Sequence, residues 1–156
     1  MNIPSPIEWR RTAESAGAGW GGDEMGVWRS EAGVSVGWSM VWDTVEDAEE
    51  ASVAFARGAL QQQRGGVVSK ADAAAAITPG GLCVERPERG PLAIRREGER
   101  LVVAMGPMRR DGHGWRSGGS CEQVASWVVG TLQTGPHQPR RIIGHDPTSG
   151  RRHLGQ

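Results

Sequence analysis

The sequence has no tyrosine, one phenylalanine, one lysine and two cysteines. Hydrophobic residues make up 37% of the 156 positions, below the roughly 45–50% usual for globular domains. No apolar run approaches the roughly 18 residues that span a membrane. Eighteen basic and eighteen acidic side chains cancel, whereas nucleic-acid binders usually carry a basic surface. We therefore expect no membrane span and no nucleic-acid partner.

The two cysteines, Cys83 and Cys121, are too far apart for a zinc knuckle and form no Cys-x-x-Cys motif. We expect each to be a small buried side chain, with a disulfide as the alternative. The four histidines show no metal-ligand spacing, and residues 1–11 lack the apolar core of a secretory signal. The sequence thus predicts no metal, no cofactor and a cytoplasmic protein, or else an exported one whose signal is missing from this sequence.

The clearest pattern is the alternation in residues 34–42, where valine, tryptophan and methionine occupy every second position. Together with the run 25–29 and a turn that ends in glycine, it predicts a β-hairpin. A long helix follows, which either Asp43 or Thr44 can cap, with acidic residues in its first turns and a glycine stop at Gly65.

Shorter elements complete the predicted fold. They are a short helix between Ser69 and Pro79, strands at 82–86, 91–95 and 100–105, and a helix between Ser120 and Gly135. Tight hairpins require antiparallel pairing, and the helices need a sheet face to cover. The predicted class is α+β, with one antiparallel sheet of about five strands and the helices packed on one face.

Composition divides the chain into three segments. Residues 1–24 form a polar, Gly-rich lead-in, residues 25–135 a single α+β domain, and residues 136–156 a disordered, Arg-rich tail. Residues 17–22 match G-x-G-x-x-G, but a dinucleotide-binding loop needs a strand before it and a helix after it. Because a hairpin follows instead, we interpret this motif as a structural loop.

The residues that could act as a catalytic base or nucleophile do not form a recognisable catalytic pattern in the sequence. His113 and Cys121 could be imagined as base and nucleophile, but a solvated loop around His113 is the better interpretation. Tryptophan and arginine, by contrast, are enriched in binding hot spots. The sequence therefore favours a non-enzymatic interaction or structural module with a protein partner or a second copy. The predicted partner surface comprises Trp20, Asp23, Trp28, Arg29 and Trp115. The alternative is a small-ligand binder or small enzyme with a pocket between sheet and helices, lined by Trp28, Asp23 and Arg29.

Four stretches together resemble a known module: Gly19–Asp23, Val27–Arg29, Trp42–Thr44 and Leu92–Val103. The module is a small C-terminal one in uncharacterised, often lipid-anchored or surface proteins of myxobacteria, related bacteria and haloarchaea, and the similarity spans residues 17–105. The resemblance implies a Gly-Trp-Gly-Gly-Asp loop that enters a hairpin, and it implies no activity. Glu24 departs from relatives that carry arginine or lysine there, which argues against a shared anion-binding role for the loop.

Overall fold

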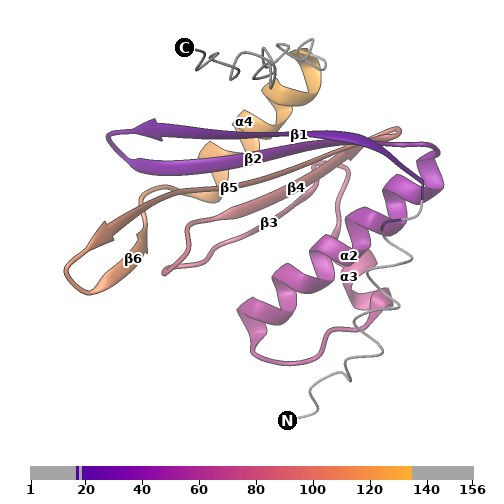
Figure 1. Cartoon of the computed structure of the whole chain (residues 1–156). Coiled ribbons are helices and arrows are strands. Elements are labelled where there is room, and N and C mark those ends of the chain that lie inside the picture. Colours follow the sequence, from indigo (N-terminus) through magenta and orange to yellow (C-terminus); the bar gives the residue numbers. More distant parts are fainter. Residues whose placement is uncertain (1–16, 18, 135–156) are drawn as a thin grey trace, which may run out of the picture.

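The computed structural model describes residues 17 and 19–134. The predicted tail and nearly all of residues 1–18 of the predicted lead-in lie outside the described residues. Within them, a six-stranded sheet is combined with helices α2 to α4 (Figure 1). In chain order the elements are β1 (Trp20–Ser30), β2 (Gly33–Trp42), α2 (Val45–Arg64), α3 (Lys70–Ala76), β3 (Leu82–Val84), β4 (Leu92–Glu97), β5 (Arg100–Asp111), β6 (Gly114–Ser117) and α4 (Cys121–Thr134).

Every strand pairing in the sheet is antiparallel, and the strand order is β1-β2-β5-β4-β3, with β6 paired to the far end of β5. This confirms the predicted α+β class with an antiparallel sheet. The predicted hairpin is confirmed as β1–β2, but β1 is longer than the predicted strand and begins at Trp20. Since β2 lies between β1 and β5, β1 forms one edge of the sheet.

The long helix α2 is stabilised at both ends as its sequence predicts. The Thr44 side chain accepts a hydrogen bond from the Asp47 backbone N–H, and Gly65 closes the helix in the left-handed conformation with φ 69°. The Ser69 side chain caps α3 in the same way. No helix in the described part of the chain is long and apolar enough to cross a membrane.

The helices lie on both faces of the sheet (Figure 1). One buried cluster joins α2 and α3 to Ile94 and Leu101, and a second joins α4 to Ala93 and Val102. Neighbouring residues of a strand point to opposite faces, so these clusters occupy opposite sides. The prediction that the helices pack on one face was wrong. The physical reason is the apolar run of residues 101–104. A strand that is apolar at consecutive positions has apolar side chains on both faces, and both faces must be covered.

A disulfide joins Cys83 of β3 to Cys121 at the start of α4, with 5.8 Å between the Cα atoms. The prediction of two unbonded, buried cysteines was therefore wrong. The sheet topology brings the first turn of α4 over the edge strand β3, although 38 positions separate the two residues. The bond fastens α4 to this edge, and the Cys121 backbone N–H also donates to the Glu85 carboxylate.

Candidate interaction surface

Strand β1 is an open edge 11 residues long, because it pairs with β2 on one side and with no described strand on the other. Four of the five residues predicted as a partner surface lie on it: Trp20, Asp23, Trp28 and Arg29. The fifth, Trp115, lies on β6. An edge strand presents unpaired backbone N–H and C=O groups, so β1 brings together most of the predicted surface and adds a hydrogen-bonding edge that the prediction did not include.

The outward backbone groups of β1 can be identified from the contacts of β2. The Trp42 N–H donates to the Glu99 carbonyl in the β4–β5 turn, so the backbone of Trp42 points toward β5. The direction of the backbone N–H and C=O groups alternates along a strand, so the carbonyl of the preceding Val41 points toward β1. Consistent with this, a Cβ added to Gly21 of β1 would lie 3.3 Å from the Val41 carbonyl oxygen. Residues 33, 35, 37, 39 and 41 of β2 therefore point toward β1.

The register of the hairpin carries this alternation into β1. Residues 33, 35, 37 and 39 stand opposite Ser30, Trp28, Gly26 and Glu24, whose backbone groups consequently point inward, toward β2. The intervening residues of β1 direct their N–H and C=O groups away from the sheet. They are Asp23, Met25, Val27 and Arg29, which we call the edge stripe.

The side chains of the edge stripe share the α2 face of the sheet. They stand opposite Met40, Trp38, Val36 and Val34, and directly opposed residues of an antiparallel pair point to the same face. Trp38 and Met40 belong to the core beneath α2.

Along the edge stripe an acidic residue, two apolar residues and a basic residue follow in order. Met25 and Val27 are 59% and 64% exposed, which is high for apolar side chains in a strand. Asp23 accepts a hydrogen bond from the Trp38 indole through one carboxylate oxygen, Oδ2. Arg29 is exposed, and the ion pairs formed among the described residues do not include it. The stripe is thus an apolar centre between opposite charges.

Trp28 has a different role, because it lies on the α4 face of β1. Its ring meets Trp127 of α4 edge-on, with 4.4 Å between centroids and 85° between planes. It also covers two glycines, since a Cβ on Gly26 or Gly37 would come within 2.3 Å or 3.0 Å of the Trp28 ring. Trp28 therefore anchors β1 to α4, although 48% of its surface stays exposed.

Trp115 lines a cavity of about 840 Å³ on the α2 side of the sheet, and its lining includes no residue of β1. Its lining includes the apolar residues Val34, Met105 and Met108. The alternative prediction of a pocket lined by Trp28, Asp23 and Arg29 does not match this cavity.

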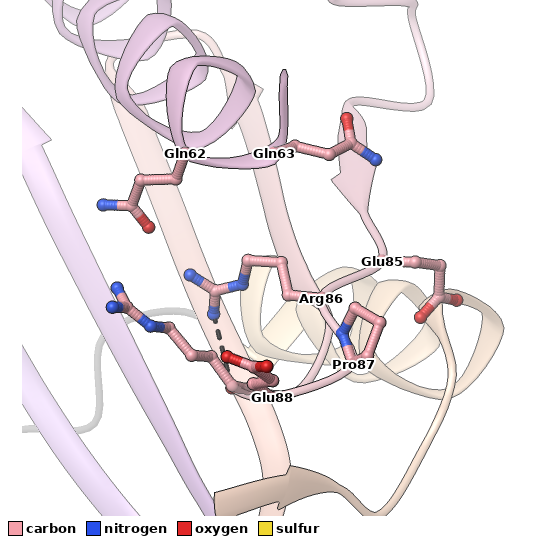
Figure 2. A pocket seen from close by; sticks show the side chains of 7 residues that line it. Gln62, Gln63, Glu85, Arg86, Pro87 and Glu88 are labelled. Carbon is pink, nitrogen blue, oxygen red and sulfur yellow. Dashed lines mark hydrogen bonds between the residues drawn. The ribbon is translucent and has the colours of Figure 1, made fainter. Parts of the chain in front are cut away.

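A pair of arginines, Arg86 and Arg89, lines the same cavity together with Gln62 and Glu88. The four also line an adjoining cavity of about 370 Å³, and Figure 2 shows Gln62 and Arg86 reaching into it from the end of α2 and from the β3–β4 loop. Burial, and then the nearby charge of Arg89, lower the pKa of Arg86. The ion pairs of the described residues include neither arginine.

Arg86 and Arg89 are not among the residues that the sequence predicts for a partner surface or a pocket, and their convergence was missed. The only signal was two arginines on either side of Pro87-Glu88. In the structure, the Arg86 Nε donates to the Gly90 carbonyl at 3.0 Å, which fixes its guanidinium beside the cavity.

The described residues contain no group of three or more His, Cys, Asp or Glu side chains placed to hold a metal ion. The imagined pairing of His113 with a Cys121 nucleophile is excluded, because the Cys121 sulfur is bonded to Cys83.

Comparison with curated proteins gives no match. Comparison with solved structures gives none either. A family model described as a domain of unknown function, DUF8575, matches residues 4–115. The match includes the whole segment 17–105 for which a resemblance was noted, while the myxobacterial and haloarchaeal distribution stays a prediction. With a match over more than two thirds of its length, the chain belongs to the DUF8575 family.

Proposed function

We propose that this protein is a non-enzymatic interaction module that binds its partner by strand addition at the β1 edge. The observation that carries the proposal is the edge stripe, which combines outward backbone groups with two exposed apolar side chains on one 11-residue strand. In strand addition, main-chain hydrogen bonds supply affinity and alternate side chains supply specificity. Met25 and Val27 would contact the partner strand, with Asp23 and Arg29 selecting its charges.

The position of β1 suits this role because the strand is held in place from behind. It is paired with β2 from Gly22 to Ser30, and Trp28 fastens it to α4 through Trp127. A partner strand therefore meets an edge that is already extended, which reduces the entropy lost on binding.

We further propose that the protein works in an oxidising compartment such as a cell surface. Disulfides persist in extracellular and periplasmic proteins and are rare in the cytosol, and Cys83 and Cys121 form one. The prediction of a cytoplasmic protein rested on the absence of a secretory signal in residues 1–11 and on cysteines expected to be unbonded, so the disulfide favours its alternative, an exported protein.

The test removes one outward N–H group from the edge. Val27→Pro deletes an N–H that points away from β2, and proline is tolerated on edge strands at such positions; the preceding Gly26 accommodates the restriction that proline imposes on its neighbour. The control Val27→Thr keeps the N–H and the β-branched shape. Both variants and the wild type are immobilised and exposed to an extract of the source organism at moderate and high salt, with bound proteins identified by mass spectrometry.

We expect the wild type and Val27→Thr to capture the same stoichiometric partner and Val27→Pro to lose it. In the isolated complex, hydrogen exchange at the amides of Met25 and Val27 should slow. Equal capture by Val27→Pro and wild type, with equal melting temperatures, would overturn the proposal.

A second candidate function rests on Arg86 and Arg89. Two guanidinium groups that make no ion pair with the described residues lie at the larger cavity. Over its apolar floor they suit a small organic anion, with the apolar part on Met105 and Trp115. Melting temperature is measured across a panel of carboxylates and phosphates for the wild type and Arg89→Gln. A stabilisation that disappears in Arg89→Gln supports this function, and unchanged melting throughout the panel counts against it.

A further inference from the structure

The edge stripe is complementary to itself when its direction is reversed. It runs from an acidic to a basic residue, so an antiparallel copy would place base opposite acid at both ends. We propose that the partner at the β1 edge is a second copy of this chain, paired antiparallel about a two-fold axis through Gly26. This inference rests on the proposed function, since it specifies the partner at the same edge.

Backbone geometry limits the possible registers of such a pair. Outward groups can bond only to outward groups, so residues of the edge stripe must oppose one another. An axis through Gly26 sets Met25 opposite Val27 of the second copy and Asp23 opposite Arg29 of the second copy. Each opposed pair exchanges two backbone hydrogen bonds.

Neighbouring registers lose this complementarity. An axis through Met25 sets Asp23 opposite Val27, and an axis through Val27 sets Met25 opposite Arg29. Each of these two registers places a charged side chain opposite an apolar one at the interface between the two β1 strands. The axis through Gly26 is the register in which apolar residues oppose apolar residues and charges oppose their opposites.

The charged groups are available for this pairing. The Trp38 indole occupies Oδ2 of Asp23, and Oδ1 is left to accept from a guanidinium. Arg29 makes none of the ion pairs found within the described residues. The two-fold symmetry produces the Asp23–Arg29 pair twice, at opposite ends of the interface.

The residue on the axis also fits. Gly26 would lie opposite Gly26 of the second copy. It has no side chain on the α4 face, where the Trp28 ring already covers it. The two strands can thus meet at the axis without displacing the Trp28–Trp127 contact. The other side chains that oppose each other on this face are Glu24 and Trp28.

The experiment exchanges charges between the two ends of the edge stripe. Arg29→Asp gives a chain with acids at both ends, and Asp23→Arg gives a chain with bases at both ends. Each variant alone would oppose like charges twice, whereas a mixed dimer of the two variants would restore two opposite-charge pairs. Sedimentation velocity measures association of the wild type, each variant and their equimolar mixture, after circular dichroism has shown that each is folded.

We expect the wild type to dimerise with a dissociation constant on the order of micromolar, as befits a small interface. Each variant alone should raise this constant by at least about tenfold, and the mixture should return to within about threefold of the wild type. If Asp23→Arg does not fold, Arg29→Asp is compared with Arg29→Lys, which keeps the charge and should keep the dimer.

Two results would overturn the inference. A wild type that stays monomeric at several hundred micromolar would exclude the second copy as partner, and a mixture no stronger than its separate variants would exclude this register. Either result leaves the proposed function standing if Val27→Pro still loses a different protein partner. If Val27→Pro keeps both self-association and partner capture, the proposed function and this inference are both refuted.

Discussion

The disulfide between Cys83 and Cys121 should stabilise the protein by an amount that can be calculated from the length of the loop it closes. It closes a loop of 38 residues between β3 and the first turn of α4. We expect the double variant Cys83→Ala/Cys121→Ala, or reduction of the wild type, to lower the free energy of unfolding without changing the fold. The fold should persist because α4 also buries Val124, Val128 and Leu132 against the sheet.

The magnitude comes from the conformational entropy that the bond removes from the unfolded chain. For a loop of 38 residues, the chain-entropy relation gives about 13 cal/mol/K, or about 4 kcal/mol at 25 °C. Native disulfides in small domains typically contribute about 2–5 kcal/mol. Because β3 has three residues and pairs with β4, this end of the sheet should open most easily once the bond is gone.

The assay is urea unfolding followed by tryptophan fluorescence, for the wild type with and without reductant and for the double alanine variant. Reduced wild type and the variant should unfold at similar, lower urea concentrations, and alkylation of the native protein should label no thiol until reductant is added. A change in unfolding free energy below about 1 kcal/mol would refute the entropic argument. Labelling of two thiols in the untreated native protein would refute the bond itself.

Three further predictions concern packing and pH. Leu101→Ala, at a fully buried position between β2 and β4, should lower the unfolding free energy by about 2–5 kcal/mol in the same urea assay. Gly37→Ala places a Cβ 2.6 Å from the Trp127 ring and should cost about 1–3 kcal/mol, whereas Gly58→Ala, where nothing lies within 4 Å of the added Cβ, should not destabilise the protein. The hydrogen bond from the His113 backbone N–H lowers the pKa of the Asp111 carboxyl in the folded protein. The stability that the ionised Asp111 contributes is therefore present above the ordinary pKa of aspartate and is lost as pH falls through the lower pKa of the folded state. An NMR titration in which Asp111 keeps or exceeds its ordinary pKa would contradict this.

The local elements were predictable because their causes lie within a few residues. Alternation in residues 34–42 specifies a half-covered strand whichever element covers it. Thr44, with the acidic residues after it, fixes the start of α2 through a hydrogen bond between neighbours in the chain. The end of α2 at Gly65 is equally local, since the left-handed conformation there favours glycine.

The relations between distant segments were not predictable in the same way. The run of residues 101–104 is recognisable as a strand, and its consecutive apolar residues indicate burial on both faces, but they do not show which helix covers each face. The pairing of Cys83 with Cys121 depends on where α4 crosses the sheet. The convergence of Arg86 and Arg89 with Gln62 likewise needs the end of α2 to lie above the β3–β4 loop.

The location of the open edge follows from what the helices cover. Helix α2 contacts β2, β3, β4 and β5, and α4 contacts β3, β4 and β5, so both are centred on the strands that carry apolar residues on two faces. Strand β1 lies beyond them and is connected chiefly through β2 and Trp28.

An apolar edge of this kind usually invites indiscriminate pairing, and proteins commonly prevent it with charges on the edge strand. The edge stripe does carry charges, but Asp23 and Arg29 are of opposite sign. Two like charges would oppose each other at both ends of the interface when the axis passes through Gly26, and would disfavour that register. Opposite charges at equal distances from Gly26 instead penalise the shifted registers and favour one. The same four side chains can therefore limit aggregation and specify a dimer.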